Sequence, residues 1–299
     1  QAGALLGEIS VSGGTDGASV CLGEFTFAAP PAGAVFVRLE GQTGDGGELR
    51  NDYQFCVLPQ VRRARPVRVL FLSGGCYEST VIHEYFKAAG FTLDDRRVSP
   101  VSPLVATTVD LAAYDVLVLG PIFNPLSSLG SSFLKQLGPA VERGLGLLCF
   151  PLNSSAYTSG RYDVDDLRGS SLEVLLPITF ADNVYRNSDD PDGHGRASKL
   201  EVTEPGHPVW SGVELDAPPD LGLRVKVQAR PGAEVLATVG DEPALVLQTR
   251  GRGRALVFTG PYGGHNYQEV GFRSWLPCHR LLANLVEFAG TGAVAEYAS

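Results

Sequence analysis

Apolar and polar residues follow two different patterns along the chain, and the pattern changes near residue 62. Before that point, short runs that alternate apolar and polar residues are separated by clusters of Gly, Pro and Asp, as strands are by turns. From Pro66 onward, short continuous apolar runs alternate with stretches whose apolar residues recur at helical spacing. The pattern predicts a β segment over residues 1–62, an α/β domain over residues 66–290 and a tail over residues 291–299.

The first segment contains four strand-like runs, fewer than the ~7 strands of a complete immunoglobulin-like sandwich. It therefore predicts a partial β-sandwich of immunoglobulin-like type. Tyr53 lies three residues before Cys56, whereas antibody domains place the tyrosine two residues before the cysteine. Whether Cys21 and Cys56 pair as a disulfide stays open.

The second region alternates strands with helices. Strands are predicted over residues 66–73, 114–121 and 145–151, with helices over residues 78–90 and 131–144. Apolar strands alternating with amphipathic helices form parallel βαβ units with right-handed crossovers. We therefore expect a doubly wound, mostly parallel, flavodoxin-like sheet with helices on both faces. A final helix over residues 272–290 is expected to turn four apolar side chains inward, namely Leu281, Leu282, Leu285 and Phe288.

Composition narrows the possible partners. The formal net charge is −9, and we interpret the one basic cluster, residues 61–68, as a linker between domains, so nucleic acid is not expected as a partner. The longest apolar run falls short of the ~18 residues of a membrane span, so we expect no membrane insertion by this segment. The five cysteines show no CxxC spacing, which argues against a zinc site, and no cofactor is expected.

In an open α/β sheet, ligands bind beyond the carboxyl ends of the strands, where the strand order switches. Three loops should meet there, residues 73–79, 151–157 and 260–269. Their candidate pocket residues are Gly74, Gly75, Cys76, Pro151, Asn153, Ser154, His265 and Asn266.

A series of motifs runs through residues 66–290: “RVLFLSGG”, “YDVLVLGPI”, “RGLGLLCFPLNSS”, “GHPVW” and “RGRALVFTG”, followed by a His-containing loop and a helix. The order of these motifs resembles the class I glutamine amidotransferase-like superfamily. The closest branch is that of the glutamine amidotransferase-like domains, and trehalose-utilisation-type proteins are more distant. Members of this branch often follow immunoglobulin-like modules in large membrane-anchored bacterial proteins. The resemblance implies that this chain belongs to such a protein. Because the sequence starts at Gln1 without an initiator Met, we expect a processed chain or a piece of a larger protein. The compartment stays open.

Active members of that superfamily carry a nucleophilic cysteine in a G-x-C-x-G elbow. When the chain is aligned on the family strand, Cys149 falls at the first Gly, Pro151 at the nucleophile and Asn153 at the second Gly. Proline has φ near −65° and cannot adopt the strained positive-φ conformation of an elbow. The resemblance therefore implies that the thiol chemistry is lost. Cys149 lies deeper in the strand, where we expect a buried, unreactive thiol.

Other candidates for chemistry are few. His265 falls where the family has a loop histidine, and Glu269 follows it. Cys76 sits in a Gly-rich loop before a helix, a position that can lower a thiol pKa. The acidic loop over residues 187–195 lacks the ligand order of an EF-hand and is interpreted as solvated. Three further histidines are expected to have structural or solvated roles, namely His83, His207 and His279.

Together these observations favour a non-catalytic glutamine amidotransferase-like domain that binds a small molecule or a protein partner as a module of a larger bacterial protein. The alternative is a hydrolase or amidotransferase that acts on an amide or sugar through Cys76 and His265. A third hypothesis is a purely architectural domain. Ligand, partner and oligomeric state stay open.

Overall fold

A computed structural model gives the structure of the chain. It describes residues 33–42, 46–57, 61–63, 65–74, 77–104, 109–120, 122, 124–151, 167–181, 198–221, 225–260, 272, 275 and 277–297. The chain divides into two compact units, one of Gln1–Gln60 with Tyr297–Ser299 and one of Val61–Glu296.

The described part of the first unit is an antiparallel hairpin of β1 (Gly33–Gln42) and β2 (Glu48–Val57). Its register places Arg38 opposite Asp52 and Glu40 opposite Arg50. The two earlier predicted strands, and Cys21 with them, lie outside the described residues. The immunoglobulin-like sandwich and the disulfide stay predictions.

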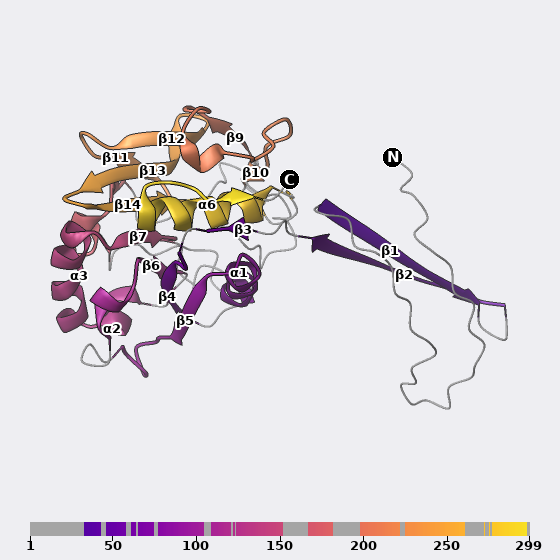
Figure 1. Ribbon diagram of the computed structural model, residues 1–299, viewed down its shortest axis with the longest axis horizontal. Helices are drawn as coiled ribbons and strands as arrows, with labels where there is room; N and C mark the ends of the chain where they lie inside the picture. Colours follow the sequence, from indigo (N-terminus) through magenta and orange to yellow (C-terminus); the bar gives the residue numbers. More distant parts are fainter. Residues whose placement is uncertain are drawn as a thin grey trace, which may run out of the picture. The chain divides into compact units, whose positions relative to one another are not determined.

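The second unit is built on a nine-stranded sheet in the order β10-β9-β12-β13-β14-β7-β6-β4-β5 (Figure 1). Five of these strands form its parallel half: β4 (Arg68–Ser73), β5 (Thr92–Arg97), β6 (Val116–Leu119), β7 (Gly146–Cys149) and β14 (Gly253–Phe258). In chain order they stand 2-1-3-4-5, which is the flavodoxin-like order. The predicted α/β fold of flavodoxin type is confirmed.

The other half of the sheet corrects the expectation of a mostly parallel one. Its strands are antiparallel: β9 (Ser198–Val202), β10 (Asp220–Leu221), β12 (Glu234–Val239) and β13 (Glu242–Arg250). The reason lies in the connections, because two residues join β12 to β13 and two join β13 to β14, and such short loops link only antiparallel strands. Two further short pairs are β8 (Ile178–Phe180) with β11 (Val227–Ala229), and β3 (Val61–Arg62) with β15 (Glu296–Tyr297).

Helices cover both faces of the sheet (Figure 1). One face packs against α1 (Tyr77–Ala88) and α6 (Cys278–Thr291), and the other against α2 (Pro125–Leu129) and α3 (Ser131–Arg143). The two cores therefore lie on either side of β4, whose successive residues Val69 and Leu70 enter opposite clusters. Burial on both faces explains why the strand reads as a continuous apolar run.

The last helix begins later than predicted. It starts at Cys278, directly after Pro277, and not at residue 272, in line with the preference for proline at the start of a helix. The four predicted inward residues are buried. Close packing depends on Gly146 in β7, where an added Cβ would lie 2.5 Å from the Ala289 backbone. None of the described helices is long and apolar enough to cross a membrane.

Candidate functional site

The candidate site lies at the edge of the sheet where the parallel strands end. The strand order reverses between β4 and β6, so the switch point, at which α/β sheets bind ligands, lies between the ends of these two strands. β4 ends at Ser73, which is buried, and the chain continues through half-buried Gly74. The loop after β4 therefore begins at the switch point.

The loop after β6 also lies at the switch point, and our sequence analysis missed it. At Gly120 an added Cβ would lie 2.8 Å from the Phe71 ring, so a residue without a side chain is needed beside β4. Asn124 has φ of 44°, a left-handed conformation that Asn tolerates better than most residues. The Asn-Pro dipeptide that begins α2 is a turn signal that could have revealed this loop.

At the end of β7, the position that would need a nucleophile is closed. Cys149 is 3% exposed, and burial raises the pKa of its thiol to about 12. Pro151 is buried directly beyond it. The Phe150 ring packs against Phe258 of β14, with 6.2 Å between the ring centroids. The thiol is therefore protonated near neutral pH and out of contact with solvent.

Residues 167–176, which we call the plug, cover the end of β7. Leu167 and Leu172 of the plug line a small cavity together with Cys149 and Pro151. The cavity has a volume of about 20 Å³, room for about one water molecule. An apolar space of this size does not admit a substrate.

Two charged side chains hold the plug in place. The buried Glu173 carboxylate accepts hydrogen bonds from the backbone N–H of Phe180, at 2.8 Å, and of Gly169. Arg230 donates to the carbonyl oxygens of Glu173 and Leu176, at 3.1 Å each. The plug is thus fixed to β8 and to the end of β11 by hydrogen bonds that a side-chain pattern alone does not reveal.

The three described histidines lie elsewhere in the fold. The Nδ1 atom of His83 lies 2.9 Å from a carboxylate oxygen of Asp95, so this residue has a partner on β5 and is not simply solvated. His207 begins the “HPVW” turn, and His279 packs beside Tyr85 with 6.4 Å between ring centroids. Within the described ranges, no group of three or more His, Cys, Asp or Glu side chains could hold a metal ion.

Of the predicted site residues, the structure describes Gly74 and Pro151. The others lie outside the described residues, and their roles stay predictions: Gly75, Cys76, Asn153, Ser154, His265, Asn266 and Glu269. The acidic loop over residues 187–195 lies outside as well. The described geometry brings together the ends of β4, β6 and β7, with β6 in the middle.

Comparison with known proteins confirms the resemblance seen in the sequence. Residues 156–290 match the family described as “Putative glutamine amidotransferase”. No curated protein matches the chain.

Three solved structures with a similar fold come from bacteria. A cytoplasmic protein of Salmonella typhimurium is 18% identical with a TM-score of 0.56, over 88% of this chain and 96% of that one. A second cytoplasmic protein, from S. typhimurium LT2, is 16% identical with a TM-score of 0.56, over 87% and 97% of the two chains. A ThuA-like protein from Parabacteroides merdae is 16% identical with a TM-score of 0.52, over 78% and 93%. At these identities the likeness establishes the fold alone.

Proposed function

We propose that this chain, which carries a glutamine amidotransferase-like domain, is a binding or interaction module without thiol catalysis. The observation that supports the proposal is the closed end of β7. Pro151 is buried there, and the plug residues Leu167 and Leu172 fill the space in front of Cys149. A nucleophilic elbow needs a small, strained turn with an exposed reactive group at this place.

The chemistry of the thiol supports the same conclusion. Attack on an amide carbon requires a thiolate that can touch the substrate and a base that takes its proton. Cys149 has a pKa of about 12 and is 3% exposed, so it offers neither a thiolate nor access. The switch point between β4 and β6, in contrast, is reached by half-buried Gly74, which has no side chain to cover its backbone. We expect a small molecule or a protein partner to bind there.

The resemblance extends the proposal to the whole protein. The branch is typical of large bacterial proteins with membrane anchors, so we infer that this segment works as one module of such a protein. The preceding hairpin is compatible with a partial immunoglobulin-like module in the same chain.

One observation favours a second candidate function. Helix α1 begins at Tyr77, and Cys76 precedes that residue in the sequence. A thiol at a helix N-terminus would be favoured as a thiolate by the helix dipole. A hydrolase or amidotransferase acting on an amide or sugar through Cys76 and His265 would use that site instead of Cys149.

Two measurements separate the two functions. One is alkylation of the native chain with iodoacetamide, with the modified cysteines identified by peptide mass spectrometry. The other is an assay for ammonia release from glutamine. We expect Cys149 to stay unmodified, Cys76 to react no faster than a free peptide thiol, and glutamine to be stable. Rapid labelling of Cys76, with turnover lost in both Cys76→Ser and His265→Ala, would overturn the proposal. A ligand-induced thermal shift that His265→Ala abolishes, without turnover, would support binding over a purely architectural role.

A further inference from the structure

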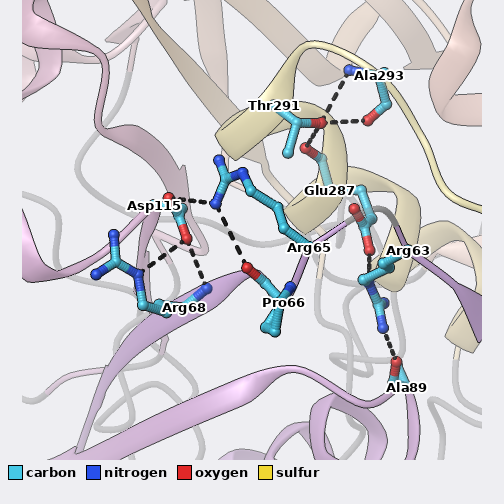
Figure 2. A network of polar contacts seen from close by, with 9 residues as sticks. All are labelled: Arg63, Arg65, Pro66, Arg68, Ala89, Asp115, Glu287, Thr291 and Ala293. Atoms are coloured by element: carbon cyan, nitrogen blue, oxygen red, sulfur yellow. Dashed lines mark hydrogen bonds and ion pairs between the residues drawn. The ribbon is translucent and has the colours of Figure 1, made fainter.

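Three arginines of the basic cluster over residues 61–68 are bound to other parts of the α/β unit, namely Arg63, Arg65 and Arg68 (Figure 2). The Arg63 side chain is only 10% exposed, which is unusual for an arginine in a linker. Its Nε donates to the carboxylate of Glu287, a residue of α6 that is itself buried, and its Nη1 donates to the carbonyl oxygen of Ala89. One guanidinium thus connects the linker to the ends of two helices.

The surroundings of Arg63 fit the shape of its guanidinium. The group lies over the ring of Phe91, with 4.3 Å from Cζ to the ring centroid, a cation–π contact that a lysine would make less well. Gly90 has φ of +77°, and an added Cβ there would lie 3.2 Å from Arg63 Nη1. The turn after α1 therefore leaves room for this side chain.

Two more arginines fix the following residues. Arg65 Nη1 lies 2.9 Å from Asp115 Oδ1, and the backbone N–H of Arg68 donates to Asp115 Oδ2 at 2.8 Å (Figure 2). Asp115 immediately precedes β6, and Arg68 begins β4. These contacts lie at the amino ends of the parallel strands, the edge opposite the candidate site.

We propose that the segment before β4, described at residues 61–63, 65 and 66, forms a docked strap, held by a releasable Arg63–Glu287 latch that couples this segment to α6. In the docked state, the strap is a rigid part of the α/β unit. When the strap is released, Glu287 is left buried without its counter-charge, which loosens α6. Among the described residues, buried Arg63 Nη2 has no hydrogen-bond partner, so the docked state carries an unsatisfied donor that water would satisfy on release, which favours release.

Limited trypsin digestion of the native full chain tests the strap, because “VRRAR” is an ideal target when it is undocked. Cleavage after Arg62 is followed by mass spectrometry in the wild type, in Glu287→Gln and in the control Glu201→Gln, an exposed position on β9. Glu287→Gln leaves the linker sequence intact, yet we expect it to speed this cleavage by about tenfold or more. The control should match the wild type.

A second variant keeps the test decisive if Glu287→Gln folds poorly. The double variant Arg63→Met with Glu287→Leu replaces the buried pair with apolar groups that can pack on Phe91, so we expect Arg62 to regain wild-type protection. Two results would overturn the proposal. In the first, the wild-type protein is cleaved after Arg62 as fast as a free peptide of residues 58–68. In the second, the Glu287→Gln variant is folded but is cleaved after Arg62 at the wild-type rate.

Discussion

The His207 side chain both caps a turn and is held in a buried place that affects its protonation. Its Nδ1 accepts a hydrogen bond from the backbone N–H of Val209 at 3.3 Å, and its ring meets Phe288 edge-on with 4.7 Å between centroids. Burial lowers the pKa of the imidazole, although the nearby Glu234 and Glu204 act in the opposite direction. The folded protein therefore favours the neutral ring.

We expect acid to weaken the wild-type fold more than that of His207→Asn. The pKa of His207 is lower in the folded than in the unfolded chain, so the unfolded state takes up the proton first as pH falls below about 6.5. The free energy of unfolding then decreases as pH falls from there toward the folded pKa. The Asn side chain can still accept the Val209 hydrogen bond but does not titrate. Urea unfolding at about pH 7.5 and about pH 5.5 measures the difference, and an equal loss in both proteins would contradict the assignment.

At the scale of elements, the plug depends on one carboxylate. Without Glu173, the backbone N–H groups of Gly169 and Phe180 lose their acceptor at a place that water reaches poorly. The plug residues Leu167 and Leu172 would then be held to the end of β7 by apolar contact alone. Access to Cys149 should follow the stability of this short segment.

We therefore expect Glu173→Ala to lower the free energy of unfolding by about 2–4 kcal/mol, since each buried donor left unpaired costs about 1–3 kcal/mol. Alkylation of Cys149 in the native protein should become measurable as the plug loosens. Urea unfolding and site-resolved labelling provide the two readouts, with Glu201→Ala as the control at an exposed glutamate. If Cys149 stays protected in a destabilised variant, the plug is not what closes the site.

The elements that the sequence predicted well are those with long, regular patterns. The buried strands β4 and β7 and the amphipathic helix α3 lie within two residues of their predicted ends, because apolar periodicity is a direct consequence of burial. Helix α2, in contrast, is five residues long and too short for a period to appear. The start of α6 was wrong because Phe272 and Trp275 pack into the same core as the helix and continue its apolar pattern.

The site was harder to predict than the fold. The fold was predictable because the alternation of strands and helices, which indicates a flavodoxin-like sheet, is visible in the sequence. The closure of Cys149, however, depends on Leu172, on the Glu173 carboxylate, which accepts hydrogen bonds from nearby backbone groups, and on Arg230, whose backbone partners are far away in the chain. Hydrogen bonds from side chains to the backbone leave no periodic signal in the sequence, so the burial of Cys149 could be predicted but the plug could not.

At the scale of the molecule, β5 forms one edge of the nine-stranded sheet. Four consecutive charged residues occupy it, from Asp94 to Arg97. Asp94 is paired with Arg96 at 2.8 Å and accepts a hydrogen bond from Tyr114, which lowers the pKa of its carboxyl. Asp95, which lies 2.9 Å from His83, and Arg97 lie on the other face. Charges on both faces of an edge strand oppose pairing with another chain.

We expect the double variant Asp95→Val with Arg97→Val to self-associate in a concentration-dependent way, because the strand then presents an apolar edge. The matched control is Lys199→Val with Glu201→Val, which removes the same two charges from β9, a strand paired on both sides. Sedimentation velocity at increasing protein concentration distinguishes the two. Equal behaviour of the two variants would mean that the charges of β5 do not protect the edge.

The pairing of β7 with β14 also has a consequence for synthesis of the chain. β7 ends at Cys149, but its second neighbour is complete only at Phe258. At a translation rate of ~5–20 residues per second, the ribosome needs roughly 5–20 s to make the intervening chain. During that time β4, β5, β6 and β7 can pair with one another. One edge of β7 has no neighbouring strand yet, and the side chains on both faces of β7 are apolar. The nascent chain is therefore most exposed to aggregation, and most in need of a chaperone, before its last core strand emerges.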